Sequence, residues 1–257
     1  PLRSRDTELM AAALRVLGVG VADDGDDWVV DGVDGPLAPT GDRVDVGNAG
    51  TVARFLPPVA ALATSPVTFD GDPRVRERPL GPLLLALRSL GVALSGVDGL
   101  PVTVSGTGAV RGGQVEVDAT QSSQLVSGLL LAGPRFDEGL VVTHAGGRLP
   151  SAPHLAMTVD ALRAAGASVD DSEPGTWSVA PGPLLARDAA VEPDLSTAAA
   201  YLAAPLVAGG SVTVADWPAD TRQPGSVLPD LLAQMGARVS RTVTSVITPN
   251  APSEPRK

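Results

Sequence analysis

The chain has 257 residues, of which 44% are hydrophobic and 19% charged, and its net charge is −10. This composition is that of a globular protein, and the negative charge argues against nucleic acid as a partner, because phosphate backbones are bound by clustered lysines and arginines. Zero cysteines exclude disulfides and thiolate metal sites, and the lack of a signal-peptide pattern or of an apolar run of roughly 18 residues predicts a cytoplasmic protein outside the membrane.

Apolar or small residues at relative positions 0, 3, 4 and 7, followed at once by glycine, recur in four segments along the chain. This spacing forms one face of an α-helix. A glycine in the next position ends a helix, because it adopts the left-handed conformation without a Cβ clash. We therefore predict four helices that end just before Gly18, Gly91, Gly166 and Gly236, each followed by a strand-like stretch.

Between these helices lies a second recurring pattern, in which a short strand, a small polar turn, an apolar helix and another strand follow one another. Its three copies begin with predicted strands at 44–46, 115–117 and 191–193, so the period is about 70 to 75 residues. Repeats of this size that mix helices with strands are longer than ordinary solenoid units. They indicate a few copies packed round an axis, each with helices covering a sheet.

The helices of this second pattern begin with small residues, which are Gly50-Thr51, Ser122-Ser123 and Ser196-Thr197. A helix N-terminus offers free N–H groups and the positive end of the helix dipole, so small residues there let an anion approach. Serine and threonine also simply cap helices, and on one helix alone that interpretation would be favoured. The repetition in three copies favours N-termini that converge on one anion-binding cleft.

The stretch 71–81, with the sequence GDPRVRERPLG, places Arg74, Arg76 and Arg78 at alternate positions. In an extended chain the three guanidinium groups would point to one face, where they would suit carboxylates and phosphates. A solvated charged loop is the alternative interpretation. A second candidate for anion binding is the turn GNAGT at 47–51, whose glycines and asparagine could cradle a phosphate or a carboxylate.

Three further features are interpreted as structural or peripheral. The acidic run at 23–27 does not match a calcium loop, so we expect a solvated hairpin turn. His144 ends a strand pattern and is expected to be structural, whereas His154 follows Ser151 at a helix start and is expected on the rim of a pocket. The two histidines have no ligand spacing, so no metal site is expected, and the sequence shows neither a Ser-His-Asp arrangement nor a close pair of carboxylates.

Four motifs occur in an order and spacing that resemble one enzyme family. They are GNAGT followed by Arg54, the arginine run at 71–81, DATQSSQLVSGLL at 118–130, and LPSAPHLAMTVDAL at 149–162. With these motifs the chain resembles the 5-enolpyruvylshikimate-3-phosphate synthases, also called 3-phosphoshikimate 1-carboxyvinyltransferases, of the bacterial shikimate pathway. The resemblance implies an α/β (α+β) fold, the enolpyruvyl transferase fold of repeated βαβαββ units, with one domain nearly complete and a second one partial.

The resemblance also implies an activity and a set of binding residues. The activity is transfer of the enolpyruvyl group of phosphoenolpyruvate to the 5-hydroxyl of shikimate 3-phosphate, without metal or organic cofactor, by proteins that are usually monomeric. Gly50 and Arg78 would bind phosphoenolpyruvate, with Thr51 and Arg54 nearby. The residues that would hold shikimate 3-phosphate are Ser122, Ser123 and Ser151, and Gln124 would touch both ligands. Asp194 matches an acidic residue at the family's crossing between domains.

The implied domains are 1–190 for most of three repeat units, 191–241 for the start of the second domain, and 242–257 for a non-native tail. A Lys-Ser…Arg segment of the family that contacts both ligands would lie upstream of Pro1. The half that supplies the proton acceptor would follow Arg241, so the acid and base groups are not assigned and we expect an inactive fragment, produced by truncation or a frameshift. Two alternatives stay open: a non-catalytic remnant that binds shikimate 3-phosphate, and a relative of UDP-N-acetylglucosamine enolpyruvyl transferase, against which the arginine run and the SSQ turn argue.

Overall fold

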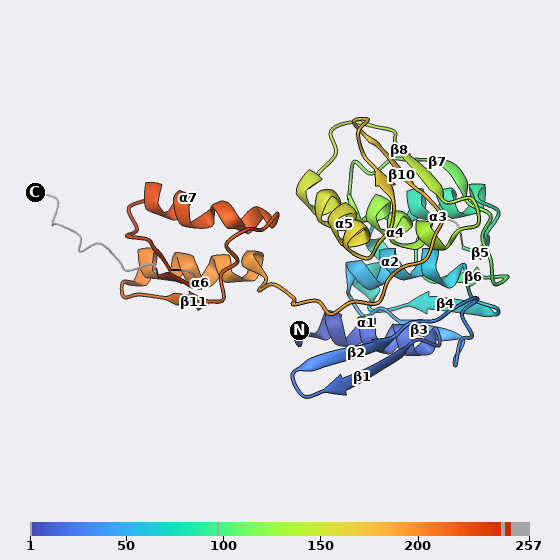
Figure 1. The fold of residues 1–257 in the computed structure, drawn as a ribbon, viewed down its shortest axis with the longest axis horizontal. Coiled ribbons are helices and arrows are strands. Elements are labelled where there is room, and N and C mark those ends of the chain that lie inside the picture. Colours follow the sequence, from blue (N-terminus) through green and yellow to red (C-terminus); the bar gives the residue numbers. More distant parts are fainter. Residues whose placement is uncertain (1, 97, 243–244, 248–257) are drawn as a thin grey trace, which may run out of the picture. The chain divides into compact units, whose positions relative to one another are not determined.

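The structure is a computed structural model, and it describes residues 2–96, 98–242 and 245–247. The chain divides into two compact units, Pro1–Asp188 and Ala189–Lys257, called unit 1 and unit 2 below (Figure 1). Each unit has its own apolar core, which is large in unit 1 and small in unit 2. Within the described ranges, no helix is both long and apolar enough to cross a membrane.

Unit 1 contains two copies of a βαβαββ unit, which confirms the expected fold class. The first copy comprises β3 (Arg43–Asp45), α2 (Gly50–Ala60), β4 (Pro66–Asp70), α3 (Gly81–Ser89), β5 (Ala93–Ser95) and β6 (Val102–Ser105). The second comprises β7 (Gly113–Val117), α4 (Gln124–Ala132), β8 (Leu140–His144), α5 (Ala152–Ala164), β9 (Val169–Asp170) and β10 (Thr176–Val179). Their sheets have the same strand order, β3-β4-β6-β5 and β7-β8-β10-β9, with a parallel first pair and antiparallel pairs after it.

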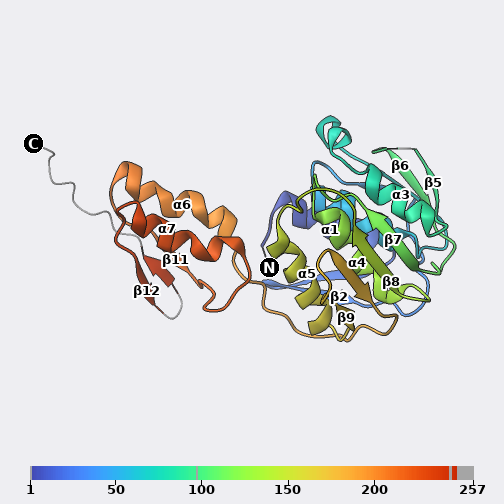
Figure 2. The ribbon, with the colours of Figure 1, turned by 90° about the horizontal axis from the view of Figure 1, so that it is seen from above.

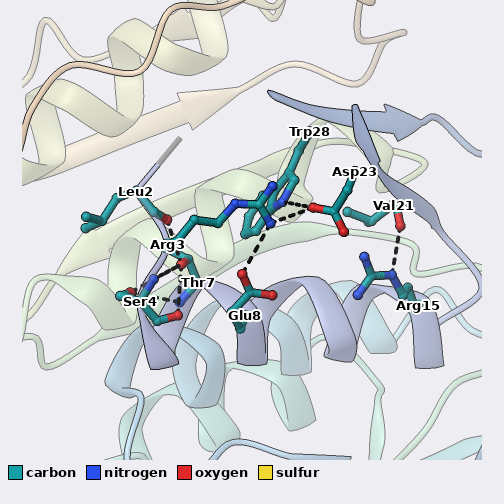
Figure 3. Close-up of polar contacts among 9 residues, drawn as sticks. All are labelled: Leu2, Arg3, Ser4, Thr7, Glu8, Arg15, Val21, Asp23 and Trp28. Atoms are coloured by element: carbon teal, nitrogen blue, oxygen red, sulfur yellow. Dashed lines mark hydrogen bonds and ion pairs between the residues drawn. The ribbon is translucent and has the colours of Figure 1, made fainter. Parts of the chain in front are cut away.

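A helix and a hairpin precede these two copies: α1 (Arg5–Val16), β1 (Gly20–Asp24) and β2 (Asp27–Asp31). The acidic run at 23–27 forms the turn of this hairpin, as predicted. Figure 3 shows how Arg3 joins the hairpin to α1, because its guanidinium pairs with Glu8 and Asp23 and lies 4.7 Å from the centre of the Trp28 ring. This cluster holds the start of the chain against the first hairpin.

The helices α2 and α4 lie between the two sheets of unit 1 (Figure 1), and α5 lies beside α4 (Figure 2). Both central helices are buried along most of their length and have no charged face apart from Arg54. Their backbones approach closely at Gly128, where an added methyl group would lie only 2.2 Å from the carbonyl oxygen of Arg54. This close contact sets Arg54 of α2 against the residues of α4.

The four helices predicted from the repeated apolar spacing are α1, α3, α5 and α7 (Leu228–Gln234). The glycine after each has a positive φ, which is the left-handed conformation expected of a helix stop. These angles are 90° at Gly18, 86° at Gly91, 87° at Gly166 and 99° at Gly236. The prediction of the helix ends is therefore confirmed.

Unit 2 contains α6 (Leu195–Ala208), β11 (Thr213–Ala215), the 3₁₀ helix η3 (Pro224–Val227), α7, β12 (Ser240–Thr242) and β13 (Ser245–Ile247). Its strand order, β11-β13-β12, repeats that of the last three strands in each copy of unit 1. Of the tail predicted at 242–257, residues 243–244 and 248–257 lie outside the described residues. Their origin is not addressed by the structure.

The strand predicted at 191–193 is wrong, because these residues have no regular structure. Pro193 has no N–H group to donate to a strand ladder. The side chain of Gln223 takes the place of a neighbouring strand: its Nε2 donates to the carbonyl oxygen of Pro193 at 3.0 Å and to the Glu192 carboxylate at 2.7 Å. The Glu192 carboxylate and the Pro193 carbonyl thus have hydrogen-bond partners without a sheet.

Candidate functional site

A cavity of about 510 Å³ is lined by α4, α5, the residues that precede these helices, and the first half of α2. Four of the predicted substrate-binding residues line it, namely Ser122, Ser123, Gln124 and Ser151. Thr51, expected nearby, and His154, expected on a pocket rim, also line it. The structure therefore brings together residues from three separate motifs of the sequence.

Two helices begin at this cavity without a side-chain cap. Ser123 precedes α4 and Ser151 precedes α5, yet neither hydroxyl bonds to its own helix, and α2 also starts without such a cap. In α6, by contrast, the Asp194 carboxylate accepts hydrogen bonds from the N–H groups of Ser196 at 2.9 Å and Thr197 at 3.3 Å. The anion-binding interpretation thus fits α2 and α4, while for α6 the capping interpretation is correct because a carboxylate already occupies the N-terminus.

Ser151 has a backbone conformation that is unusual for a residue with a side chain. Its φ of 54° and ψ of 47° lie in the left-handed region. Such strain in a non-glycine residue costs on the order of 1 kcal/mol or more and is found mostly at functional sites. The conformation places Ser151 directly at the start of α5, on the wall of the cavity.

Three further polar residues on the cavity wall were not predicted, namely Gln121 and the hydroxyl residues Ser127 and Thr158. Their hydroxyl oxygens lie 2.9 Å apart, and the Thr158 hydroxyl donates to the carbonyl oxygen of His154 at 3.0 Å. Ser127 stands alone as a polar residue within the apolar stretch 125–132, which is the sequence signal that could have marked it. This chain of hydroxyls joins α4 to the first turn of α5.

Arg54 and Arg78 meet at the start of α2. An added methyl group at Gly50 would lie 2.8 Å from Nη1 of Arg54 and 2.8 Å from Nη1 of Arg78, so both guanidinium groups face one point. Arg54 is only 7% exposed, and burial, followed by the charge of Arg78, lowers its pKa. In the part of the chain that the structure describes, neither arginine forms an ion pair. A carboxylate or phosphate at this point would relieve the repulsion between the two like charges.

Gln124 connects this arginine pair to the cavity. Its side-chain oxygen accepts a hydrogen bond of 2.9 Å from Nη1 of Arg54, and Gln124 also lines the cavity. Gly50 and Arg78 do not line the cavity themselves, but a methyl group on Gly50 would lie 3.5 Å from the side-chain oxygen of Gln124. The predicted binding residues therefore fall into two adjacent groups that meet at Gln124.

The three alternating arginines do not share a face, so that prediction is wrong. Residues Pro73–Glu77 form a 3₁₀ helix, η1, in place of the extended chain that was expected. A proline is favoured at the first position of a helical turn, because its φ is already helical. Arg76 pairs with Asp70 through two hydrogen bonds of 3.0 Å and 2.9 Å. Arg78, in contrast, approaches Gly50, with Nη1 2.8 Å from the place that a methyl group on this glycine would occupy. Arg76 is thus a structural residue of this loop.

Asp70 at the end of β4 anchors this arginine loop. Removing its carboxylate should lower the stability of unit 1 by an amount that depends on pH. Its pairs with Arg76 and Arg43 lower the pKa of the Asp70 carboxyl. A group whose folded pKa is lowered stabilises the fold above its unfolded pKa of about 4, and loses this effect as pH falls through the folded value. We expect Asp70→Asn to destabilise unit 1 by about 1 to 2 kcal/mol at neutral pH.

The measurement is urea denaturation of the two proteins at neutral pH and in steps down to about pH 3, below the ordinary carboxylate pKa. The difference in unfolding free energy between them should shrink as the pH falls. Glu116→Gln changes an exposed carboxylate on β7 and is the control. A difference that stays constant across this range would show that Asp70 acts through packing alone.

Comparison with known proteins gives the family context of this site. The family model described as EPSP synthase (3-phosphoshikimate 1-carboxyvinyltransferase) matches residues 1–256. The 3-phosphoshikimate 1-carboxyvinyltransferase of Mycobacterium ulcerans is 52% identical over 255 residues, which cover 99% of this chain and 58% of that protein.

Solved structures give the same family. An EPSP synthase from Acinetobacter baumannii matches with a TM-score of 0.74 and 26% identity, over 97% of this chain and 57% of that one. The enolpyruvyl transferase NikO from Streptomyces tendae matches with a TM-score of 0.65 and 19% identity, over 96% of this chain and 57% of that one, and shares the fold. The chain thus spans a little more than half the length of these relatives.

Proposed function

Because the chain belongs to the EPSP synthase family, we propose that it acts in the transfer of the enolpyruvyl group of phosphoenolpyruvate to the 5-hydroxyl of shikimate 3-phosphate. Unit 1 supplies both binding sites in this proposal. Shikimate 3-phosphate occupies the cavity of Ser122, Ser123 and Ser151, and phosphoenolpyruvate lies at Gly50 and Arg78. We further propose a monomer in the cytoplasm that acts without a metal or an organic cofactor.

The observation that carries this proposal is the position of Gln124 between the two sites. It lines the cavity and accepts a hydrogen bond from Arg54, whose guanidinium faces the same point as that of Arg78. A ligand in the cavity and an anion beside Gly50 would therefore be neighbours. Two substrates that react with each other must be held in such contact, because orientation supplies much of the rate of a bimolecular reaction.

The chemistry of the two sites fits the two substrates. In the proposed reaction the 5-hydroxyl oxygen gives up its proton and adds to C2 of phosphoenolpyruvate while C3 takes a proton. C3 then loses a proton as phosphate leaves from the tetrahedral intermediate, which forms the enolpyruvyl ether. The carboxylate and phosphate of phosphoenolpyruvate suit two guanidinium groups, and the phosphate monoester suits hydroxyls at open helix N-termini. No carboxylate or lysine is present among the described residues that line the cavity, so the role we assign to unit 1 is binding and orientation.

An Arg78→Ala substitution tests the assignment of the phosphoenolpyruvate site. Loss of a charge-assisted hydrogen bond should weaken phosphoenolpyruvate binding by about tenfold or more, while the affinity for shikimate 3-phosphate stays within about threefold. Calorimetry measures both, with phosphoenolpyruvate added to protein already saturated with shikimate 3-phosphate. Arg74→Ala removes an exposed arginine of the same run and is the matched control.

The outcomes separate the parts of the proposal. An equal loss for both ligands, or the same loss in the Arg74→Ala control, would contradict the placement of phosphoenolpyruvate at Arg78. If the unmodified protein does not bind shikimate 3-phosphate at all, the proposed function itself is wrong.

A further inference from the structure

The wall of the cavity is almost entirely uncharged. Its polar residues are hydroxyls and amides, contributed by Thr51, Gln121, Ser122, Ser123, Gln124, Ser127, Ser151 and Thr158. His154 is the one titratable side chain among the described residues that line it. Any change in the charge of this wall between pH 5 and pH 8 must therefore come from a single imidazole, because histidine titrates in about this range.

The imidazole of His154 is free to meet a ligand. His154 lies in the first turn of α5, is exposed, and donates its backbone N–H to the carbonyl oxygen of Ser151 at 2.9 Å. In the described part of the chain, neither of its ring nitrogens has a hydrogen-bond partner. The ring can therefore take up a proton or donate one to a bound anion without breaking an existing contact.

The charged groups around α5 lie away from the cavity. Two elements pack against α5. The helix α4 carries no charged residue, and the strand β9 carries Asp170, whose carboxylate accepts a hydrogen bond from the N–H of Ser172 at 3.0 Å. On α5 itself, Asp160 and Arg163 stand six and nine residues after His154 and do not line the cavity, and Arg163 pairs with Asp171 at 2.6 Å. Arg148 precedes the helix and is also absent from the cavity wall.

His144, the other histidine of the chain, is bound on both sides of its ring. Its Nδ1 accepts a hydrogen bond from the N–H of Ala119 at 3.3 Å, and its Nε2 lies 2.9 Å from the carbonyl oxygen of Gly147. This ring is thus a structural group, as predicted from the sequence. It provides a reference within the same molecule for the behaviour of His154.

We propose that His154 is a pH-dependent binding residue of this cavity, which holds the phosphate monoester of the ligand more tightly when its ring is protonated. The inference rests on the proposed function, because the ligand is taken to be shikimate 3-phosphate. An imidazolium adds a positive charge and a donor to a cavity wall that also carries three serine hydroxyls and the uncapped N-termini of α4 and α5. A neutral imidazole retains one donor and no charge.

Calorimetry with the full chain and its His154→Gln variant tests the proposal. Glutamine keeps hydrogen-bonding capacity but cannot take up a proton. We expect the ratio of the two dissociation constants, variant over unmodified protein, to be about 1 at pH 8 and to rise to about 10 near pH 5.5, because a charged ring strengthens the bond to the phosphate. The phosphate monoester itself titrates near pH 6, but both proteins meet the same free ligand, so the protonation of the free ligand cancels in the ratio.

Two controls locate the effect at the phosphate. Shikimate without its phosphate should show a ratio that does not depend on pH, since it lacks the group that the protonated ring is proposed to bind. Ser122→Ala should weaken the binding of shikimate 3-phosphate by a similar factor at every pH, because a hydroxyl does not titrate here. A pH-dependent ratio with shikimate as well would place the charge of His154 at the carboxylate and overturn the proposal.

Proton NMR gives a second readout that does not depend on affinity measurements. The two histidines give two separate ring Cε1–H signals, which are followed during a pH titration with and without shikimate 3-phosphate. By reciprocal linkage, the ligand should move the midpoint of the His154 signal to higher pH by about one unit if binding is tenfold tighter to the protonated form. The His144 signal should not move.

The result that overturns the inference differs from the one that overturns the proposed function. If shikimate 3-phosphate binds to the unmodified protein and to His154→Gln with the same pH profile, then His154 has no role in recognition and the inference is wrong. If shikimate 3-phosphate binds to neither protein at any pH, the proposed function is wrong.

Discussion

Replacing Gly128 with alanine is expected to destabilise unit 1 by about 2 kcal/mol, although alanine is the better helix former. Gly128 lies within α4, where propensity alone would make the substitution stabilising by about 1 kcal/mol. The added methyl group, however, would lie 2.2 Å from the carbonyl oxygen of Arg54 and 3.4 Å from Cα of Phe55. Backbone atoms of a packed helix cannot rotate away, so α2 and α4 must separate.

Separation of these helices should also disturb the site, because Gln124 at the start of α4 accepts a hydrogen bond from Arg54 of α2. Hydrogen exchange measured by mass spectrometry on peptides from α2 and α4 gives the stability of unit 1 separately from that of unit 2. The matched control is Gly81→Ala at the start of α3, where the nearest atom would be 3.5 Å away, an ordinary contact. If exchange in the Gly128 variant is no faster than in the control, packing at the α2–α4 contact is not the limit on this position.

Gly50→Ala is expected to affect binding more than stability, in contrast to Gly128→Ala. Phosphoenolpyruvate binding should weaken by about tenfold to a hundredfold, with little change in the stability of unit 1. The methyl group would meet Nη1 of Arg54 and Nη1 of Arg78, both at 2.8 Å. These atoms are the ends of flexible side chains, which can move at little cost to the fold. Their movement would, however, separate the two charges from the point where we place the anion.

Calorimetry of phosphoenolpyruvate in the presence of shikimate 3-phosphate measures this effect, and hydrogen exchange measures the stability. Gly81→Ala is again the control, since Gly50 and Gly81 are both the first residue of a helix. Unchanged phosphoenolpyruvate affinity in Gly50→Ala would mean that the anion site does not lie between the two arginines. A large loss of stability would mean that the guanidinium groups are held too firmly to adjust.

Together the two substitutions distinguish a structural glycine from a binding glycine in the same pair of helices. The sequence marks Gly50 by its place in the turn GNAGT, whereas Gly128 lies inside an apolar stretch without such a motif. In the structure the two glycines differ in what each faces, which is backbone at Gly128 and the ends of two cationic side chains at Gly50. The backbone that Gly128 meets, at Arg54 and Phe55, is distant from it in the sequence, and so is Arg78 from Gly50. Arg54, by contrast, stands in the same helix as Gly50.

Errors in the sequence-based predictions have a common physical origin. The strand predicted at 191–193 and the shared face of Arg74, Arg76 and Arg78 both rested on short local patterns. A strand needs a partner, and at Pro193 the side chain of Gln223 bonds to the carbonyl instead. The three arginines would share a face only if the chain were extended there. Residues 73–77 instead form a 3₁₀ helix, with Arg76 paired to Asp70. In both places a contact from outside the motif decided the conformation.

The sequence by itself determined the four helices that end at a glycine and the family to which the chain belongs. Apolar spacing and the glycine stops are local properties, because a helix satisfies its own hydrogen bonds and its ending depends on a few neighbouring residues. Only the tertiary structure decided which helix N-termini are open and which side chains meet. Arg54 and Gln124 stand 70 residues apart, and their hydrogen bond exists because Gly128 lets two helices approach. Such convergence depends on packing between distant segments, which no local pattern encodes.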